Sequence, residues 1–205
     1  MTYMTRALKT NLTIASLIIL VSCNAISYTE LYPYFKNAVV GVPDIEINDE
    51  YIQNKKYSFI RTRFGKSATA IFSLSSINNN IYTWVNGESE LLKTYNGKVI
   101  YVNGVGMANM QIHNFEYFGP TISKENAYYQ IQFKSPGAFI SQSATYSVNY
   151  VNNLIELDEK FTSNPIKWHR SNKYSFDSRN MPSRTEQYIN PNLPLLEIDF
   201  YFLYR

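Results

Sequence analysis

The chain has 205 residues, a formal net charge of +3 and one cysteine. This small excess of positive charge gives no electrostatic reason to expect a nucleic acid as partner, and a single cysteine excludes an intramolecular disulfide. The 18 tyrosines and 12 phenylalanines favour strands over helices, because aromatic side chains pack well on a half-buried sheet. We therefore expect a mainly β fold.

The first 22 residues have the pattern of a lipoprotein signal peptide. Arg6 and Lys9 precede an apolar run over residues 12–21, which is too short to span a bilayer. The run ends in Leu-Val-Ser-Cys, which is typical of a lipobox, so Cys23 is the expected site of lipidation by diacylglycerol and palmitate. A cleaved signal that leaves a free Cys23 thiol, or an uncleaved apolar helix, is the alternative.

The residue after Cys23 bears on which membrane holds the protein. Asn24 stands there, whereas an aspartate would resemble the inner-membrane retention signal of enterobacterial lipoproteins. Several acyl chains on one residue would hold the protein more firmly than a single chain, which binds reversibly. We therefore expect an anchor in the outer membrane.

The rest of the chain is predicted to contain a tether and one β domain. Residues 23–54 would form the lipid anchor, the tether and a short helix over residues 28–40, where apolar side chains recur at three- and four-residue spacing. Residues 41–54 contain Gly, Pro and Asn and are interpreted as a connector. Residues 55–205 would form an antiparallel β domain.

Period-two alternation and turn signals predict the strands of this domain. They are expected at residues 56–64, 68–74, 81–85, 91–95, 98–102, 128–134, 139–150, 154–161, 166–170 and 195–204. Asn96-Gly97 separates two of them, and this dipeptide is typical of a two-residue type I′ hairpin turn. Short strands joined in order by tight turns predict an antiparallel meander, as a sandwich or an incomplete barrel.

Two blocks of residues carry a resemblance to a known family. The first block contains Arg61, Gly65, Thr83-Trp84-Val85, Leu91, Asn96-Gly97-Lys98-Val99 and Gly104. The second contains Asn172, Tyr174, Phe176, Asp177, Ser183, Glu186, Gln187, Pro191, Leu193 and Pro194. The pattern resembles the YjbF/GfcB family of lipoproteins, which are encoded with group 4 capsule and related exopolysaccharide systems. Two departures are Lys98, where the family tends to have Arg, and the lack of a Trp near Ser175.

This resemblance implies an outer-membrane lipoprotein that is mostly β, faces the periplasm and acts in the assembly or export of a surface polysaccharide. Its partners would be the outer membrane, through the lipid anchor, and a polysaccharide or proteins of the export machinery. The resemblance implies no catalytic activity.

The residues that metal and nucleophile chemistry require are sparse. His113 and His169 have no second ligand at metal spacing, so both are interpreted as strand residues with ordinary hydrogen bonds. We expect no metal, no cofactor and no nucleophile, because the chain also lacks a Gly-x-Ser-x-Gly motif.

Paired carboxylates remain as a route to catalysis, because glycoside cleavage needs an acid and a base or nucleophile on either side of a sugar. Asp177 and Glu186 are the pair to test, and solvated loop carboxylates are the alternative interpretation. Asp158 and Glu159, in a charged run at a strand end, are interpreted as surface residues.

Glycan binding requires fewer groups than catalysis. A tryptophan ring can offer a face to a pyranose, and cations can pair with acidic sugars. The candidate glycan-binding residues are Trp84, Trp168, Arg61 and Arg63, with Lys167 and Arg170 as further cations. Core packing of each tryptophan, and a solvated strand edge for each cation, is the alternative.

Three functional classes therefore compete. A lipoprotein that binds a polysaccharide during assembly or export, without catalysis, fits the lipobox and the resemblance. A glycan-processing enzyme would need two carboxylates facing each other across a cleft. A carrier of apolar cargo would need an incomplete barrel with a wide apolar interior.

Overall fold

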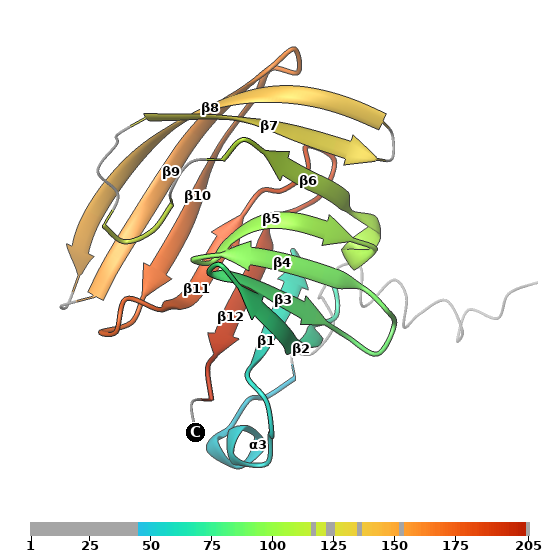
Figure 1. Ribbon diagram of the computed structural model, residues 1–205, viewed down its shortest axis with the longest axis vertical. Helices are drawn as coiled ribbons and strands as arrows, with labels where there is room; N and C mark the ends of the chain where they lie inside the picture. Colours follow the sequence, from blue (N-terminus) through green and yellow to red (C-terminus); the bar gives the residue numbers. More distant parts are fainter. Residues whose placement is uncertain (1–44, 116–117, 122–125, 135–136, 152–153, 204–205) are drawn as a thin grey trace, which may run out of the picture. The chain divides into compact units, whose positions relative to one another are not determined.

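A computed structural model describes residues 45–115, 118–121, 126–134, 137–151 and 154–203, which form an antiparallel β-barrel (Figure 1). In this part of the chain, the helix α3 (Asp49–Gln53) precedes the strands, and a 3₁₀ turn, η1 (Val105–Met107), lies between β5 and β6. The strands are β1 (Phe59–Phe64), β2 (Ala70–Asn78), β3 (Ile81–Val85), β4 (Leu91–Tyr95), β5 (Lys98–Asn103), β6 (Asn109–His113), β7 (Asn126–Lys134), β8 (Gly137–Val151), β9 (Leu154–Asn164), β10 (Trp168–Phe176), β11 (Pro182–Gln187) and β12 (Leu196–Tyr201).

The barrel is closed by its first and last strands. Consecutive strands pair antiparallel, as the predicted meander requires, and β1 pairs with both β2 and β12. Phe59 lies opposite Tyr201, and their rings stack with centroids 4.7 Å apart. The predicted sandwich or incomplete barrel is therefore corrected to a closed barrel, which leaves neither terminal strand with an unpaired edge.

Most predicted strands are present, but two were missed. The structure adds β6 and β11, and it extends β10 to Phe176. Strand β11 reads Pro-Ser-Arg-Thr-Glu-Gln, so its inward residues Pro182, Thr185 and Gln187 carry no apolar alternation for a sequence pattern to detect. This segment is a strand because its backbone pairs antiparallel with β10 on one side and β12 on the other.

The predicted signal, Cys23 and the helix over residues 28–40 lie outside the described residues. Within the predicted connector, α3 forms one short helix, and Asn48 caps it by accepting a hydrogen bond of 2.8 Å from the Tyr51 amide. Among the helices of the described ranges, none is long and apolar enough to cross a membrane.

The Asn96-Gly97 hairpin between β4 and β5 is confirmed. Tyr95 pairs with Lys98, and the two loop residues have φ values of 46° and 85°, as a type I′ turn requires. A Cβ atom on Gly97 would also lie 2.9 Å from the Cβ of Pro182. Glycine is needed here for both backbone conformation and space.

Strands β5 and β11 contact each other across the interior, although they are not neighbours in the sheet. The Val99 amide donates to Gln187 Oε1 over 2.9 Å, and Gln187 Nε2 donates to the Gly97 carbonyl over 2.7 Å. Val99 lies opposite Thr94, and Gln187 Oε1 accepts a hydrogen bond of 3.4 Å from the Tyr174 hydroxyl. The bridge is thus linked to two interior groups of side chains, one around Trp84 (the Trp84 cluster) and one around Lys98 (the Lys98 cluster).

The Trp84 cluster consists of Tyr82, Trp84, Thr94, Phe200 and Phe202. Trp84 is fully buried, stacks on Tyr82 at a centroid distance of 5.9 Å and meets Phe200 edge to face, also at 5.9 Å. Its indole Nε1 donates to Thr94 Oγ1 over 2.9 Å. The only polar atom of the indole is thus satisfied inside an aromatic core.

Candidate functional site

The Lys98 cluster is a polar centre inside the barrel, formed by Lys98, Tyr129, Gln142, Tyr146, Glu159, Asn172 and Tyr174. Lys98 Nζ donates to Glu159 Oε1, and both side chains are buried. Tyr129 also donates to Oε1, over 2.6 Å, while Tyr174 and Asn172 donate to Oε2 over 2.7 and 2.8 Å. Both oxygens of the carboxylate therefore accept hydrogen bonds from side chains of the protein, as a buried charge requires.

Glu159 was interpreted from the sequence as a surface residue, and this interpretation is wrong. Glu159 is 0% exposed on β9, and it alternates inward with Leu157 and Phe161. The flanking Asp158 and Lys160 point outward, so a run of three charged residues concealed the period-two pattern.

Aromatic rings surround the Lys98 ammonium. Its Nζ lies 4.3 Å from the ring centroid of Tyr129 and 5.1 Å from that of Phe118. Phe118 belongs to the segment between β6 and β7, and its carbonyl accepts a hydrogen bond of 2.7 Å from Asn96 Nδ2 in the hairpin turn. The ammonium thus gains cation–π attraction in addition to its ion pair.

Burial and the ion pair act in opposite directions on the Glu159 carboxyl. Burial acts to raise its pKa, but the Lys98 charge and hydrogen bonds from Lys98, Tyr129 and Asn172 outweigh it, so the pKa lies below its ordinary value of 4.5. Burial lowers the pKa of Lys98, and Glu159 offsets part of this effect. Burial and the Glu159 charge raise the pKa of Tyr129 well above 10.0, which keeps its hydroxyl a donor.

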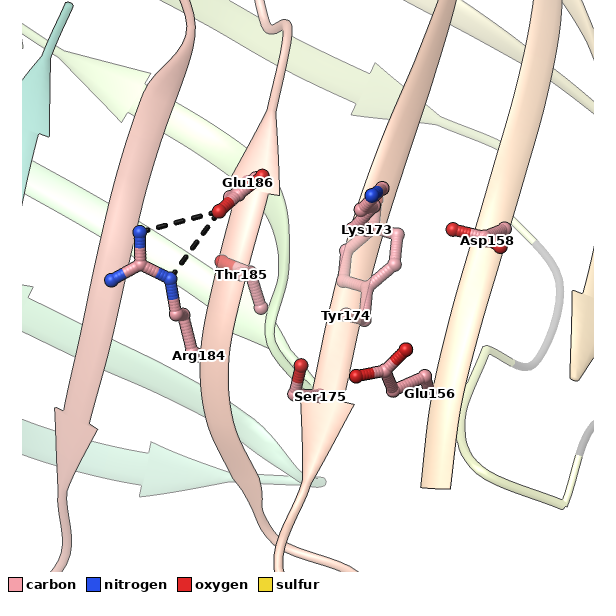
Figure 2. Close-up of a pocket in the computed structure, with 8 residues that line it drawn as sticks. All are labelled: Glu156, Asp158, Lys173, Tyr174, Ser175, Arg184, Thr185 and Glu186. Carbon is pink, nitrogen blue, oxygen red and sulfur yellow. Dashed lines mark hydrogen bonds and ion pairs between the residues drawn. The ribbon is translucent and has the colours of Figure 1, made fainter. Parts of the chain in front are cut away.

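A first hollow, the charged hollow, lies on the outside of β9, β10 and β11 and has a volume of about 260 Å³ (Figure 2). It is lined by Glu156, Asp158, Lys173, Tyr174, Ser175, Arg184, Thr185 and Glu186. Arg184 forms ion pairs with Glu186, Glu197 and Asp199 at 3.2, 2.8 and 3.0 Å. The carboxylates of the chain itself therefore already surround this cation.

The structure separates the two carboxylates that the sequence paired. Glu186 lines the charged hollow, but Asp177 is not among its lining residues. Asp177 lies in the turn after β10, where it accepts hydrogen bonds from Arg179 Nη2 over 2.7 Å and from the Met181 amide over 3.0 Å. Partial burial acts to raise its pKa, but these hydrogen bonds outweigh it and lower the pKa below 3.8.

A second hollow, the neutral hollow, lies along β7 and β8 and has a volume of about 430 Å³. It is lined by Asn114, Tyr128, Tyr129, Gln130, Ser141, Gln142, Ser143 and Asn164, none of which is Asp, Glu, Lys or Arg. Tyr128 is 73% exposed, whereas Tyr129 and Gln142 are buried. The sequence indicated no site here, because isolated polar residues on strands are ordinary surface residues.

The predicted tryptophans are not at the surface. Trp84 is 0% exposed and Trp168 is 5% exposed, and the Trp168 ring packs edge to face on Phe161 with centroids 4.8 Å apart. In this structure both rings pack in the core, which was the alternative interpretation. An aromatic face for a ligand is offered instead by exposed tyrosines such as Tyr128.

Of the predicted cations, Arg61 and Arg63 lie together on β1, on the outer face of the barrel, whereas Arg170 lies on β10 and Lys167 immediately precedes that strand. Arg61 donates to Asp199 Oδ2 from Nε over 3.0 Å and from Nη2 over 2.6 Å. Arg63 lies opposite Glu197 in the register of β1 and β12. An acidic ligand at Arg61 would have to displace Asp199.

Both histidines form hydrogen bonds to neighbouring strands. His113 bonds Gln132 and His169 bonds Thr162, each over 3.1 Å. In the part of the chain that the structure describes, no group of three or more His, Cys, Asp or Glu side chains could hold a metal ion.

Comparisons with known proteins support the fold alone. No family model and no curated protein matches the chain. The hypothetical lipoprotein YmcC from Escherichia coli has a similar structure, with a TM-score of 0.66 and 17% identity over 87% of this chain and 97% of YmcC. A protein described as a candidate lipoprotein from Parabacteroides distasonis matches with a TM-score of 0.37 and 11% identity, over 73% of this chain and 96% of that one.

Proposed function

We propose that this chain is a lipoprotein anchored in the outer membrane through Cys23, that it faces the periplasm, and that it binds a surface polysaccharide during assembly or export without turning it over. The observation that carries the proposal is the exposed hollow on β7 and β8, where an aromatic ring lies beside hydroxyl and amide groups. Such groups bind polar ligands by contact and need no reactive residue.

The packing of the interior favours this function over transport of apolar cargo. Both interior clusters consist of side chains in contact with one another, and the Lys98 cluster places an ion pair and three tyrosine hydroxyls inside the barrel. An acyl chain entering there would strip hydrogen bonds from a buried charge. The outer face is therefore the better place for a ligand.

The setting of the candidate carboxylates favours binding over catalysis. A general acid is usually a carboxyl group whose pKa is raised, but the hydrogen bonds to Asp177 lower its pKa, and Glu186 is paired with Arg184. The fold shared with YmcC, which is described as a hypothetical lipoprotein, supports the lipoprotein part of the proposal.

The test uses the producing cells. Replacing Cys23 with Ala should abolish incorporation of radioactive palmitate and lower the amount of surface polysaccharide, because the domain is released from its membrane. Asp177→Asn and Glu186→Gln should leave the polysaccharide unchanged. Persistent labelling would refute the anchor. Shortening of the polysaccharide by the purified protein, stopped by either carboxylate change, would show an enzyme instead.

A further inference from the structure

We infer that the neutral hollow binds an uncharged segment of polysaccharide, with Tyr128 as the ring on which a sugar packs. This inference rests on the proposed binding function, and it adds the site and the chemical class of the ligand. It also moves glycan recognition away from the tryptophans and arginines that the sequence suggested.

The polar groups of the hollow match those of a neutral sugar. Serine hydroxyls and the side-chain amides of Asn and Gln offer both donors and acceptors. A sugar hydroxyl also both donates and accepts. The polar groups of the hollow can therefore supply an acceptor for its hydrogen and a donor for its oxygen. Because no Asp, Glu, Lys or Arg lines the hollow, an acidic sugar would be desolvated there without a counter-charge.

The aromatic and small residues are arranged for one sugar ring. In the register of β7 and β8, Tyr128 lies opposite Ser143, and Gln130 lies opposite Ser141. The two serines are exposed and leave space beside the phenol ring. The apolar C–H face of a sugar can pack on that ring while its hydroxyls reach the serines and Gln130.

The base of the hollow is held by the interior network. Gln142 Nε2 donates to the Tyr129 hydroxyl over 2.7 Å, and that hydroxyl donates to Glu159. Ser163 Oγ donates to Gln142 Oε1 over 3.4 Å. A surface whose side chains are already fixed loses less entropy when a ligand binds.

The charged hollow makes a poorer site for the same polymer. Glu156, Asp158 and Glu186 line it together with Lys173 and Arg184, so its carboxylates outnumber its cations. An acidic polymer would meet net repulsion there, and a neutral one would have to compete with the ion pairs of Arg184. Its volume is also smaller, about 260 Å³ against about 430 Å³.

The experiment measures binding of three neutral polymers and of their carboxymethylated forms to the full-length lipoprotein in detergent. Dextran, laminarin and galactomannan are the probes, and affinity electrophoresis gives the dissociation constants. We expect at least one neutral polymer to bind, and its carboxymethylated form to bind at least tenfold more weakly. Each pair shares one polymer backbone and differs in the added carboxymethyl groups, so the ratio reports whether the site accepts an acidic ligand.

Matched variants locate the site. Tyr128→Ala should weaken binding at least tenfold, while Tyr128→Phe, which keeps the ring, should change it less than threefold. Tyr150 also lies on β8 and is 77% exposed, but it does not line the hollow. Tyr150→Ala is therefore the control and should leave binding unchanged.

The outcomes separate this inference from the proposed function. Tighter binding of the carboxymethylated polymers would overturn the neutral class but leave a polysaccharide-binding protein. Equal losses in the Tyr128 and Tyr150 variants would overturn the site. Equal melting temperatures of the parent and the variants will show that the variants are folded. If the folded parent binds no polymer of either kind, both the inference and the proposed function fail.

Discussion

The two interior clusters stabilise the same barrel by different means. The Trp84 cluster packs aromatic rings around one internal hydrogen bond, whereas the Lys98 cluster surrounds a buried ion pair with hydroxyl and amide groups. Removing one group from an apolar core lowers stability by an amount that grows with the apolar atoms removed and with the cavity left behind. Removing one partner of a buried ion pair leaves an uncompensated charge, so the second cluster should respond far more sharply.

The largest effect is expected for Glu159→Leu. This change leaves the Lys98 ammonium buried without its counter-ion and should destabilise the protein by about 3–5 kcal/mol. Urea unfolding followed by tryptophan fluorescence measures the effect. The double variant Lys98→Met, Glu159→Leu should recover most of the loss, and Glu156→Gln, on the outside of β9, should change stability little. A double variant as unstable as the single one would contradict the ion-pair account.

Acid should weaken the Lys98 cluster selectively. The pKa of Glu159 in the folded protein lies below 4.5, the ordinary value that applies to the unfolded chain. At a pH between the folded and the unfolded pKa, the unfolded chain therefore binds a proton at Glu159 that the folded chain does not. Stability from Glu159 is therefore present above about pH 4.5 and lost as pH falls through the folded value. Lys98 and the hydroxyls of Tyr129, Tyr146 and Tyr174 face this carboxylate. Urea midpoints from pH 6 to 3 should fall more steeply in the parent than in the double variant.

Gly97→Val tests the β5–β11 bridge between the clusters. A β-branched residue at a φ of 85°, with a Cβ only 2.9 Å from that of Pro182, should cost about 2–4 kcal/mol through backbone strain and overpacking. Gly87→Val is the control, because no heavy atom beyond Gly87 and its two chain neighbours lies within 4 Å of the Cβ position. Thermal melting measures the decrease in melting temperature of each variant relative to the parent. Equal decreases for the Gly97 and Gly87 variants would contradict the steric argument.

The smallest effect is expected for Thr94→Val in the Trp84 cluster. The substitution keeps the shape of the side chain but leaves the buried indole Nε1 of Trp84 without its acceptor, which should cost about 1–2 kcal/mol. Ser73→Val, at an exposed position on β2, is the control. Urea unfolding should place the Thr94 variant well above Glu159→Leu in stability. The reverse order would remove the contrast between the clusters.

Local features of this fold were predictable and long-range ones were not. The Asn96-Gly97 turn was predicted because its conformation depends on two adjacent residues. Closure of the barrel depends on the pairing of Phe59–Phe64 with Leu196–Tyr201, for which no local pattern exists. The meander could therefore be predicted, but not whether it closed.

The candidate site was predicted less well than the fold. A tryptophan on a strand is compatible both with core packing and with a ligand site, so Trp84 and Trp168 were candidates for a surface that they do not reach. The inward position of Glu159 did leave a signal, because Leu157 and Phe161 flank it at a spacing of two. The neutral hollow is lined by residues of β7, β8 and β9 and by Asn114 after β6, which only the sheet register brings side by side.

Closure of the barrel by β1 and β12 also makes the fold depend on β12 being synthesised intact. A chain shortened before Leu196 would lack β12, so the backbone groups of β1 and β11 that now pair with it would be exposed. Open strand edges promote aggregation with other chains. We therefore expect a nonsense mutation before Leu196 to yield a chain that proteases remove, rather than a shortened but functional protein.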